Sequence, residues 1–74
     1  MKYEAYFNEF CKVHGYTGKY KYNSETDEYD IIISKDGDNA GAFLDEDEYQ
    51  SLTIEELQGT LELLHKGFKA KFNR

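Results

Sequence analysis

The sequence contains no proline and no tryptophan, and Cys11 is its only cysteine among 74 residues. A single cysteine excludes an internal disulfide, so we expect a reducing, cytoplasmic setting. Because proline and runs of glycine and serine are absent, no linker is apparent, and residues 1–74 are expected to form a single domain. A core of this size supplies only ~3–5 kcal/mol of net stability, which leaves a homodimer open.

Long apolar runs are also missing. The first residues include Glu4, Asn8 and Glu9 where a signal peptide would need an apolar segment. No stretch approaches the roughly 18 apolar residues that a membrane-spanning helix requires. We therefore expect a protein that stays inside the cell and has no membrane partner.

Positive charge is scarce, since nine lysines and arginines stand against fifteen acidic residues and the formal net charge is −6. Nucleic acids and anionic membranes are held mainly by lysine and arginine. This balance argues against direct binding to either and permits a basic partner. Acidity of this degree also keeps small proteins soluble, an interpretation that needs no partner.

Patterns for metal binding and catalysis are incomplete. Cys11 and His14 are one helical turn apart, but no second pair at suitable spacing completes a zinc site. Residues 36–47 place acids at positions 1, 3 and 12 of the calcium-loop pattern, yet position 5 is Ala40 and a strand-like run precedes them. A hairpin turn is the favoured interpretation of that segment. With no nucleophile paired to a base, we expect no enzyme, no metal and no cofactor.

Helical periodicity marks both ends of the chain. Apolar residues recur at three- and four-residue steps over residues 2–14, and Gly15 suits the end of that helix. Thr53 and Glu56 form a capping box that begins a second helix. Gly59 within this helix suggests close packing. The helix is expected to run to about Lys66 with a helical or frayed continuation, and the alternative is a helix to Phe72. Its apolar stripe comprises Ile54, Leu57, Leu61, Leu64 and Phe68.

Between the two predicted helices, apolar residues recur at every second position, which is the period of a strand. Residues 17–23 alternate lysine and tyrosine, which predicts a half-buried strand and also fits a surface that stacks on bases; the many acids nearby disfavour the second interpretation. A second strand is predicted over residues 29–35, a tight turn at Asp36-Gly37 and a weaker third strand over residues 40–44. Gly41 is expected to mark a bulge or a close backbone approach.

These elements predict an α+β fold in the order α-β-β-β-α. Both helices are expected to pack on one apolar face of a three-stranded antiparallel sheet, giving two layers. That face comprises Tyr20, Tyr22, Tyr29, Ile31 and Ile33. The molecule should then be polarised, with the basic residues Lys66, Lys69, Lys71 and Arg74 opposite the acidic loops.

Residues 25–48 hold ten of the fifteen carboxylates and one basic residue, Lys35. The segment ends in Asp45, Glu46, Asp47 and Glu48, followed by Tyr49, which we expect to be exposed and to add contact area. Alternate side chains on one face of an extended strand repeat at roughly 6.5–7 Å, which is of the order of the spacing between backbone phosphates. A continuous outward ridge of carboxylates can therefore occupy a channel that a protein uses for DNA.

The short acidic chain, the leading helix, the Ile-rich strand running into Lys35-Asp36-Gly37-Asp38, and the closing helix with His65-Lys66-Gly67-Phe68 resemble the small phage-encoded anti-CRISPR proteins that block Cas9. The resemblance implies an α-β-β-β-α protein whose acids occupy the site where the effector reads the PAM duplex. The residues it assigns to partner binding are Asp36, Asp38, Asp45, Glu46, Asp47 and Glu48.

We therefore expect an acidic inhibitor that mimics nucleic acid and binds a basic nucleic-acid-binding protein in the host cytoplasm, with no direct nucleic-acid binding of its own. The alternative is a small intracellular interaction or regulatory module. In that case the acidity serves solubility alone, and the contact surface is an apolar or aromatic patch.

Overall fold

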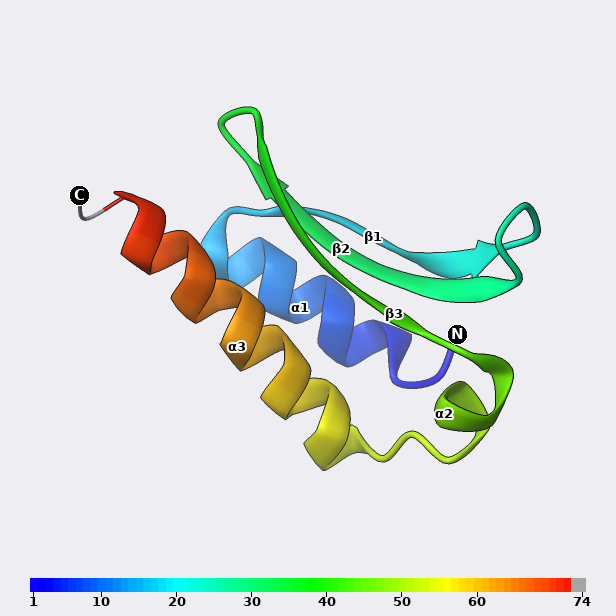
Figure 1. Cartoon of the computed structure of the whole chain (residues 1–74). Coiled ribbons are helices and arrows are strands. Elements are labelled where there is room, and N and C mark those ends of the chain that lie inside the picture. Colours follow the sequence, from blue (N-terminus) through cyan, green and yellow to red (C-terminus); the bar gives the residue numbers. More distant parts are fainter. Residues whose placement is uncertain (73–74) are drawn as a thin grey trace.

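The computed structural model describes the backbone of residues 1–72 and the side chains of residues 1–70. The predicted α+β class and α-β-β-β-α order are confirmed, with one short helix added before the last (Figure 1). The elements are α1 (Glu4–His14), β1 (Thr17–Asn23), β2 (Glu28–Lys35), β3 (Asp38–Leu44), α2 (Glu46–Gln50) and α3 (Ile54–Phe72).

The three strands form an antiparallel sheet in the order β1-β2-β3. The turn between β2 and β3 has Asp36 at φ 53° and Gly37 at φ 83°, the left-handed pair that a type I′ hairpin requires. The register continues past Gly41 without a bulge. A Cβ at Gly41 would lie 3.3 Å from the backbone oxygen of Ile31 and 3.2 Å from Ile32 Cγ1, so the expected close backbone approach is confirmed.

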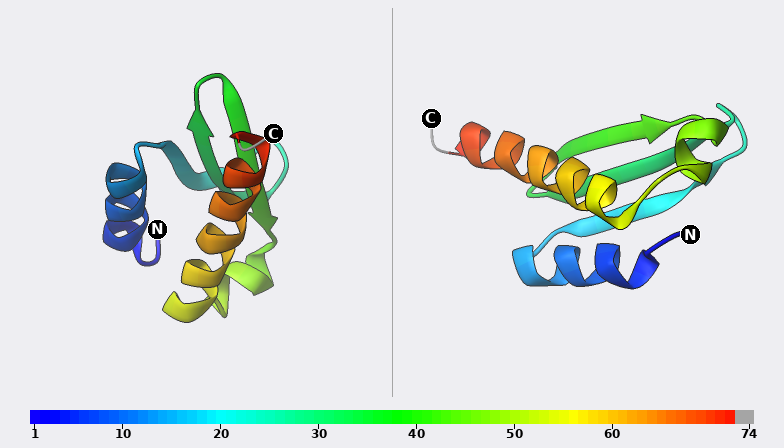
Figure 2. Two further views of the ribbon diagram at one scale, coloured as in Figure 1. Left: turned by 90° about the vertical axis from the view of Figure 1, so that its left-hand side faces the viewer. Right: turned by 90° about the horizontal axis from the view of Figure 1, so that it is seen from below.

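The helices α1 and α3 cover one face of the sheet and leave the other open, as the two views in Figure 2 show. This arrangement confirms the two-layer prediction. Side chains of both helices and of the covered face meet in one core. Its buried members are Phe7, Phe10, Cys11, Tyr20, Ile31, Ile33, Tyr49, Leu52, Leu57, Leu61 and Phe68.

The last helix has the longer of the two extents that the sequence allowed. The capping box is confirmed, since Glu56 N donates to Thr53 Oγ1 (3.2 Å) and Thr53 N donates to Glu56 Oε1 (3.0 Å). The helix continues past Lys66 and Gly67 to Phe72, so the continuation is helical and the longer alternative is confirmed. Phe68 is 3% exposed, and its burial outweighs the cost of about 1 kcal/mol for a helical glycine.

Gly59 does not mark close packing, because a Cβ there would meet no atom within 4 Å. That expectation was wrong. Two of the predicted basic groups, the side chain of Lys71 and all of Arg74, lie outside the described residues. Within residues 1–72, no helix has both the length and the apolar character needed to cross a membrane.

Candidate protein-binding surface at the acidic end

The acidic run after β3 is the start of a helix. Asp45 is the N-cap of α2: its Oδ1 accepts a hydrogen bond from Glu48 N (2.8 Å), and Asp45 N donates to Glu48 Oε1 (3.0 Å). Acids in a first helical turn interact favourably with the positive end of the helix dipole. An extended row of carboxylates is therefore the wrong description of this segment, because the acids are arranged around a turn.

The acids assigned to partner binding fall into two groups. Asp36 lies in the β2–β3 turn and Asp38 begins β3, whereas Asp45–Glu48 follow the other end of that strand. The seven residues of β3 separate the groups by roughly 20 Å at 3.3 Å per residue. The single continuous ridge expected from the sequence is therefore wrong.

A different set of acids lies at one end of the molecule. The β1–β2 turn lies at the same end of the molecule as α2 (Figure 1), and Tyr29 of β2 donates from its hydroxyl to Glu46 Oε2 (2.7 Å). Among residues 1–70, none of the acids at this end forms a salt bridge. The salt bridge found within residues 1–70 joins the Met1 ammonium to Glu4. We call the seven residues the acidic end: Glu25, Asp27, Glu28, Asp45, Glu46, Asp47 and Glu48.

Tyr49 is a packing residue. It is 9% exposed, so the expectation of an exposed interface tyrosine was wrong. Its ring stacks on Tyr29 with centroids 3.9 Å apart and planes 3° from parallel, and Tyr29 in turn contacts Tyr22 at 5.0 Å. The Tyr49 hydroxyl also accepts from Lys2 N (2.7 Å). We call Tyr22, Tyr29 and Tyr49 the tyrosine stack, and it joins the hairpin, α2 and the N-terminal segment.

The tyrosine stack also orients two of the carboxylates. Tyr22 donates its hydroxyl hydrogen bond to Asp27, as Tyr29 does to Glu46. The bond to Glu46 is the main reason that the pKa of Tyr29 is raised to about 12. The same bond, with a second from Gln50 Nε2 (2.9 Å), lowers the pKa of Glu46. The ionised carboxylate is thus both stabilised and held in place.

Two signals in the sequence pointed to this arrangement. Asp45 followed three residues later by Glu48 fits the same capping-box pattern as Thr53 and Glu56. Pairing of the predicted strands through the short turn places Tyr22 opposite Tyr29. What the sequence could not supply is the position of Tyr49, because it depends on where α2 folds back against the hairpin.

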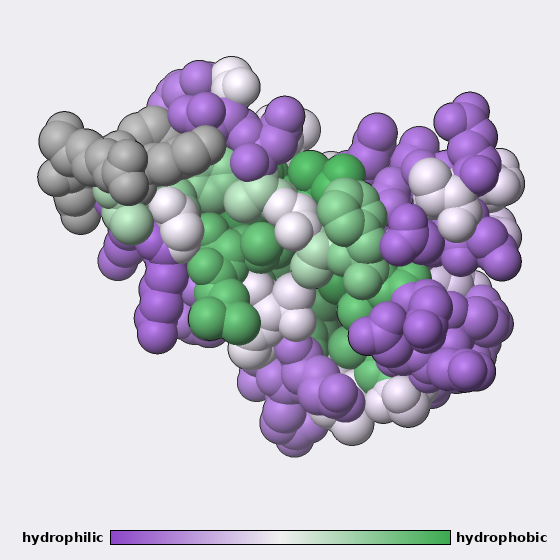
Figure 3. Space-filling view, in the orientation of Figure 1, coloured by the Kyte–Doolittle hydropathy of each residue, from purple (hydrophilic) through white to green (hydrophobic). Residues whose placement is uncertain are grey.

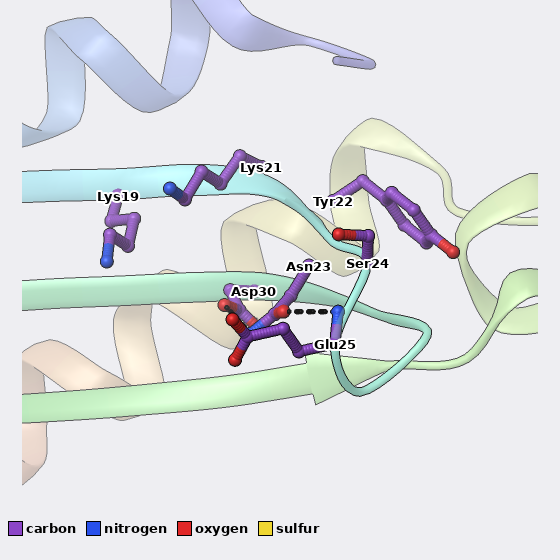
Figure 4. Close-up of a pocket in the computed structure, with 7 residues that line it drawn as sticks. All are labelled: Lys19, Lys21, Tyr22, Asn23, Ser24, Glu25 and Asp30. Carbon is purple, nitrogen blue, oxygen red and sulfur yellow. Dashed lines mark hydrogen bonds between the residues drawn. The ribbon is translucent and has the colours of Figure 1, made fainter.

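A hollow of about 350 Å³ on the open sheet face borders the acidic end (Figure 4). Asp30 lies at its floor and is 5% exposed. Asn23 links the floor to the turn, because its Nδ2 donates to Asp30 Oδ2 (3.4 Å) and its Oδ1 accepts from Glu25 N (3.0 Å). Glu25 of the acidic end lines the hollow together with Lys19 and Lys21, so the charge of the hollow is mixed.

The lysines and tyrosines of β1 do not share one surface. Tyr20 is buried in the core beneath the sheet, whereas Lys19 and Lys21 are exposed and line the hollow on the open face. The alternating pattern is therefore that of a half-buried strand. The exposed aromatic residue on the open face is Phe43 of β3, two strands away, with 55% of its surface accessible.

Cys11 and His14 belong to the packing between elements. Cys11 is buried, which raises the pKa of its thiol. The His14 ring packs against Phe10 and His65, with centroid distances of 4.5 and 4.3 Å. Within the described part of the chain, no three His, Cys, Asp or Glu side chains are grouped so that they could hold a metal ion.

Comparisons with models of protein families, with curated proteins and with solved structures gave no match. The geometry of the acidic end and the charge of the chain are therefore the basis for a functional proposal.

Proposed function

We propose that this protein is an acidic inhibitor that occupies the nucleic-acid-binding surface of a basic DNA- or RNA-handling protein in the host-cell cytoplasm. The observation that supports this most is the acidic end, where seven acidic residues from two separate segments lie at one end of the molecule and form no salt bridge among residues 1–70. Arginines and lysines of a nucleic-acid channel are the complementary surface.

The acidic end is suited to such a surface because part of it is held in position before binding. The tyrosine stack fixes Glu46 and Asp27, so less conformational entropy is lost when arginines engage them. Each arginine can form charge-assisted, bidentate hydrogen bonds with a carboxylate. The concentrated charge also accelerates association with a basic partner. An effector such as Cas9, whose arginines read the PAM duplex, is a partner of this class.

The alternative function is an interaction module whose acidity only maintains solubility. Phe43 favours this alternative, because it is 55% exposed and lies diagonally across from Ile32 on the open face. In that case a partner would bind the open face and would tolerate loss of charge at the acidic end.

Removing charge from the acidic end separates the two functions. The variant Glu25→Gln/Asp47→Asn changes exposed side chains that make no hydrogen bond within the described residues. Because charge-assisted hydrogen bonds contribute about 1.5–3 kcal/mol each, we expect inhibition of DNA binding by a purified Cas9–guide RNA complex to weaken at least about tenfold. The measurement is competition with a labelled target duplex at low and high salt.

The matched control is Glu9→Gln/Glu62→Gln, which removes the same charge from exposed positions on α1 and α3. It should inhibit as the wild-type protein does. Equal inhibition by both double variants, or inhibition that salt does not affect, would contradict a role for the acidic end. If no variant competes with DNA, the mimicry proposal fails for this effector.

A further inference from the structure

The two edges of the sheet differ in how they are protected. Exposed edge strands are usually blunted by lysines, prolines or bulges. β1 carries the exposed Lys19 and Lys21, and α1 packs against it. On β3, residues 39–43 contain no charge and no proline, and the register has no bulge. In Figure 1 and Figure 2 no other described element lies beyond β3.

The register identifies the backbone groups on this edge. The type I′ turn makes Lys35 and Asp38 a hydrogen-bonded pair, and bonded and non-bonded pairs alternate along an antiparallel ladder. The N–H and C=O groups of Asn39, Gly41 and Phe43 are therefore directed to the free edge. These three N–H donors and three C=O acceptors, on every second residue, are the groups that pair with one added strand.

Both sides of the edge offer apolar surface to an added strand. Phe43 projects on the open face, while Ala40 and Ala42 are half-buried on the covered face. Along the covered side α3 packs against β3, and Figure 3 shows apolar side chains gathered over this region of the molecule. Small residues on β3 leave room for larger side chains of an incoming strand.

The charges at the two ends of β3 define the partner. Asp36 lies before the strand and Asp45–Glu48 follow it, so an uncharged edge of five residues, 39–43, is bracketed by acids. A second copy paired antiparallel through β3 would place its own acids opposite these, and like charges opposed in this way are destabilising. A segment with basic residues at both ends is complementary.

From these observations we propose that β3 accepts an extended segment of a partner protein as a fourth strand. The segment has about five apolar or small central residues and basic residues at each end. Main-chain hydrogen bonds to Asn39, Gly41 and Phe43 hold it, and the flanking acids select its charge. The proposal deepens the proposed function, on which it rests for the charge contact with α2.

A synthetic peptide tests this directly. The probe is a nine-residue peptide with five central residues that alternate threonine and valine, and with two basic residues at each end. We expect it to bind and to slow hydrogen exchange at the amides of Asn39, Gly41 and Phe43, measured by NMR. The same peptide with N-methyl groups on its pairing amides should bind at least about tenfold more weakly, since it cannot donate hydrogen bonds. Glutamates in place of its basic residues should also abolish binding.

Two variants of Phe43 isolate the main-chain contribution. Phe43→Pro and Phe43→Val both remove the ring, but only proline removes an outward N–H, and edge positions tolerate proline. With the fold of each verified by circular dichroism, the proline variant should bind the peptide about tenfold more weakly than the valine variant. Equal binding by the two, no binding by the wild-type protein, or binding without protection of the three amides would overturn the proposal.

If the same amides are protected from hydrogen exchange without peptide, to a degree that rises with protein concentration, the edge pairs with a second copy. That result would also overturn the strand proposal.

The outcomes for the two proposals remain distinct. Suppose that Phe43→Pro and Phe43→Val inhibit the effector equally, and that Glu25→Gln/Asp47→Asn inhibits it less than the wild-type protein does. The strand proposal then fails and the proposed function stands. If Phe43→Pro instead inhibits less than Phe43→Val, and Glu25→Gln/Asp47→Asn inhibits as the wild-type protein does, the proposed function fails and the strand proposal stands.

Discussion

At the scale of single residues, two glycines show how the same residue type can be required or merely tolerated. Gly18 on β1 lies under α1, where a Cβ would be 2.6 Å from both Cys11 Sγ and Phe7 Cε1. Phe7 is 2% exposed and cannot move away without disturbing the core. A Cβ at Gly59 in α3 would point into open space.

Alanine substitutions at these positions should therefore have opposite effects on stability. We expect Gly18→Ala to lower the free energy of unfolding by roughly 1–3 kcal/mol, as overpacking does, and Gly59→Ala to raise it by about 1 kcal/mol through helix propensity. Urea denaturation of the two variants and the wild-type protein checks both signs. Destabilisation by Gly59→Ala would mean that α3 has a neighbour at this position.

At the scale of elements, α1 and α3 meet through aromatic and imidazole rings at the end away from α2. His65 Nδ1 lies 2.7 Å from the Tyr16 hydroxyl, and its ring contacts that of His14. Desolvation lowers the pKa of His65 below its usual 6.5, and the nearby His14 and Lys69 lower it further. The neutral imidazole is thus the form that the folded protein favours.

This contact predicts that stability falls on acidification. Because the pKa of His65 is lower in the folded than in the unfolded state, its contribution is present above about pH 6.5 and is lost as the pH falls through the folded value. His65→Gln stays neutral and keeps an acceptor for Tyr16, so its melting temperature should decrease less with pH. Parallel melting curves from neutral to mildly acidic pH compare the two; identical slopes would contradict the role of His65.

The elements that the sequence predicted well are those with local signals. The glycine at the end of α1, the Asp36-Gly37 turn and the capping box at Thr53 each describe a few neighbouring residues, and the structure contains all three. The five-residue helix α2 is too short to show a helical period. The grouping of its acids with the β1–β2 turn depends on contacts between distant segments, which composition and period do not encode.

At the scale of the whole molecule, the predicted polarity of charge is confirmed only in part, because the β2–β3 turn with Asp36 lies at the same end as the C-terminal part of α3 (Figure 1). The acidic end lies opposite the end of α3, where Lys66 and Lys69 are exposed. Like charges gathered at one end repel one another and lower the stability of the folded state. A surface kept for binding a basic partner should therefore cost the free protein some stability.

Removing charge from the acidic end should accordingly stabilise the free protein at low salt. In Glu25→Gln/Glu28→Gln, both changes lie at the β1–β2 turn, outside the first turn of α2, so no helix-dipole interaction is lost. We expect a gain of about 0.2–1 kcal/mol, as for other surface charge effects, that shrinks as salt screens the repulsion within the Debye length of ~10 Å at 0.1 M. Calorimetric melting at low and high salt measures it. The control variant Glu9→Gln/Glu62→Gln carries the same net charge and should gain less stability, because its acids are not part of the acidic end. An equal gain in stability would mean that the net charge of the protein, and not the concentration of charge at one end, sets the repulsion.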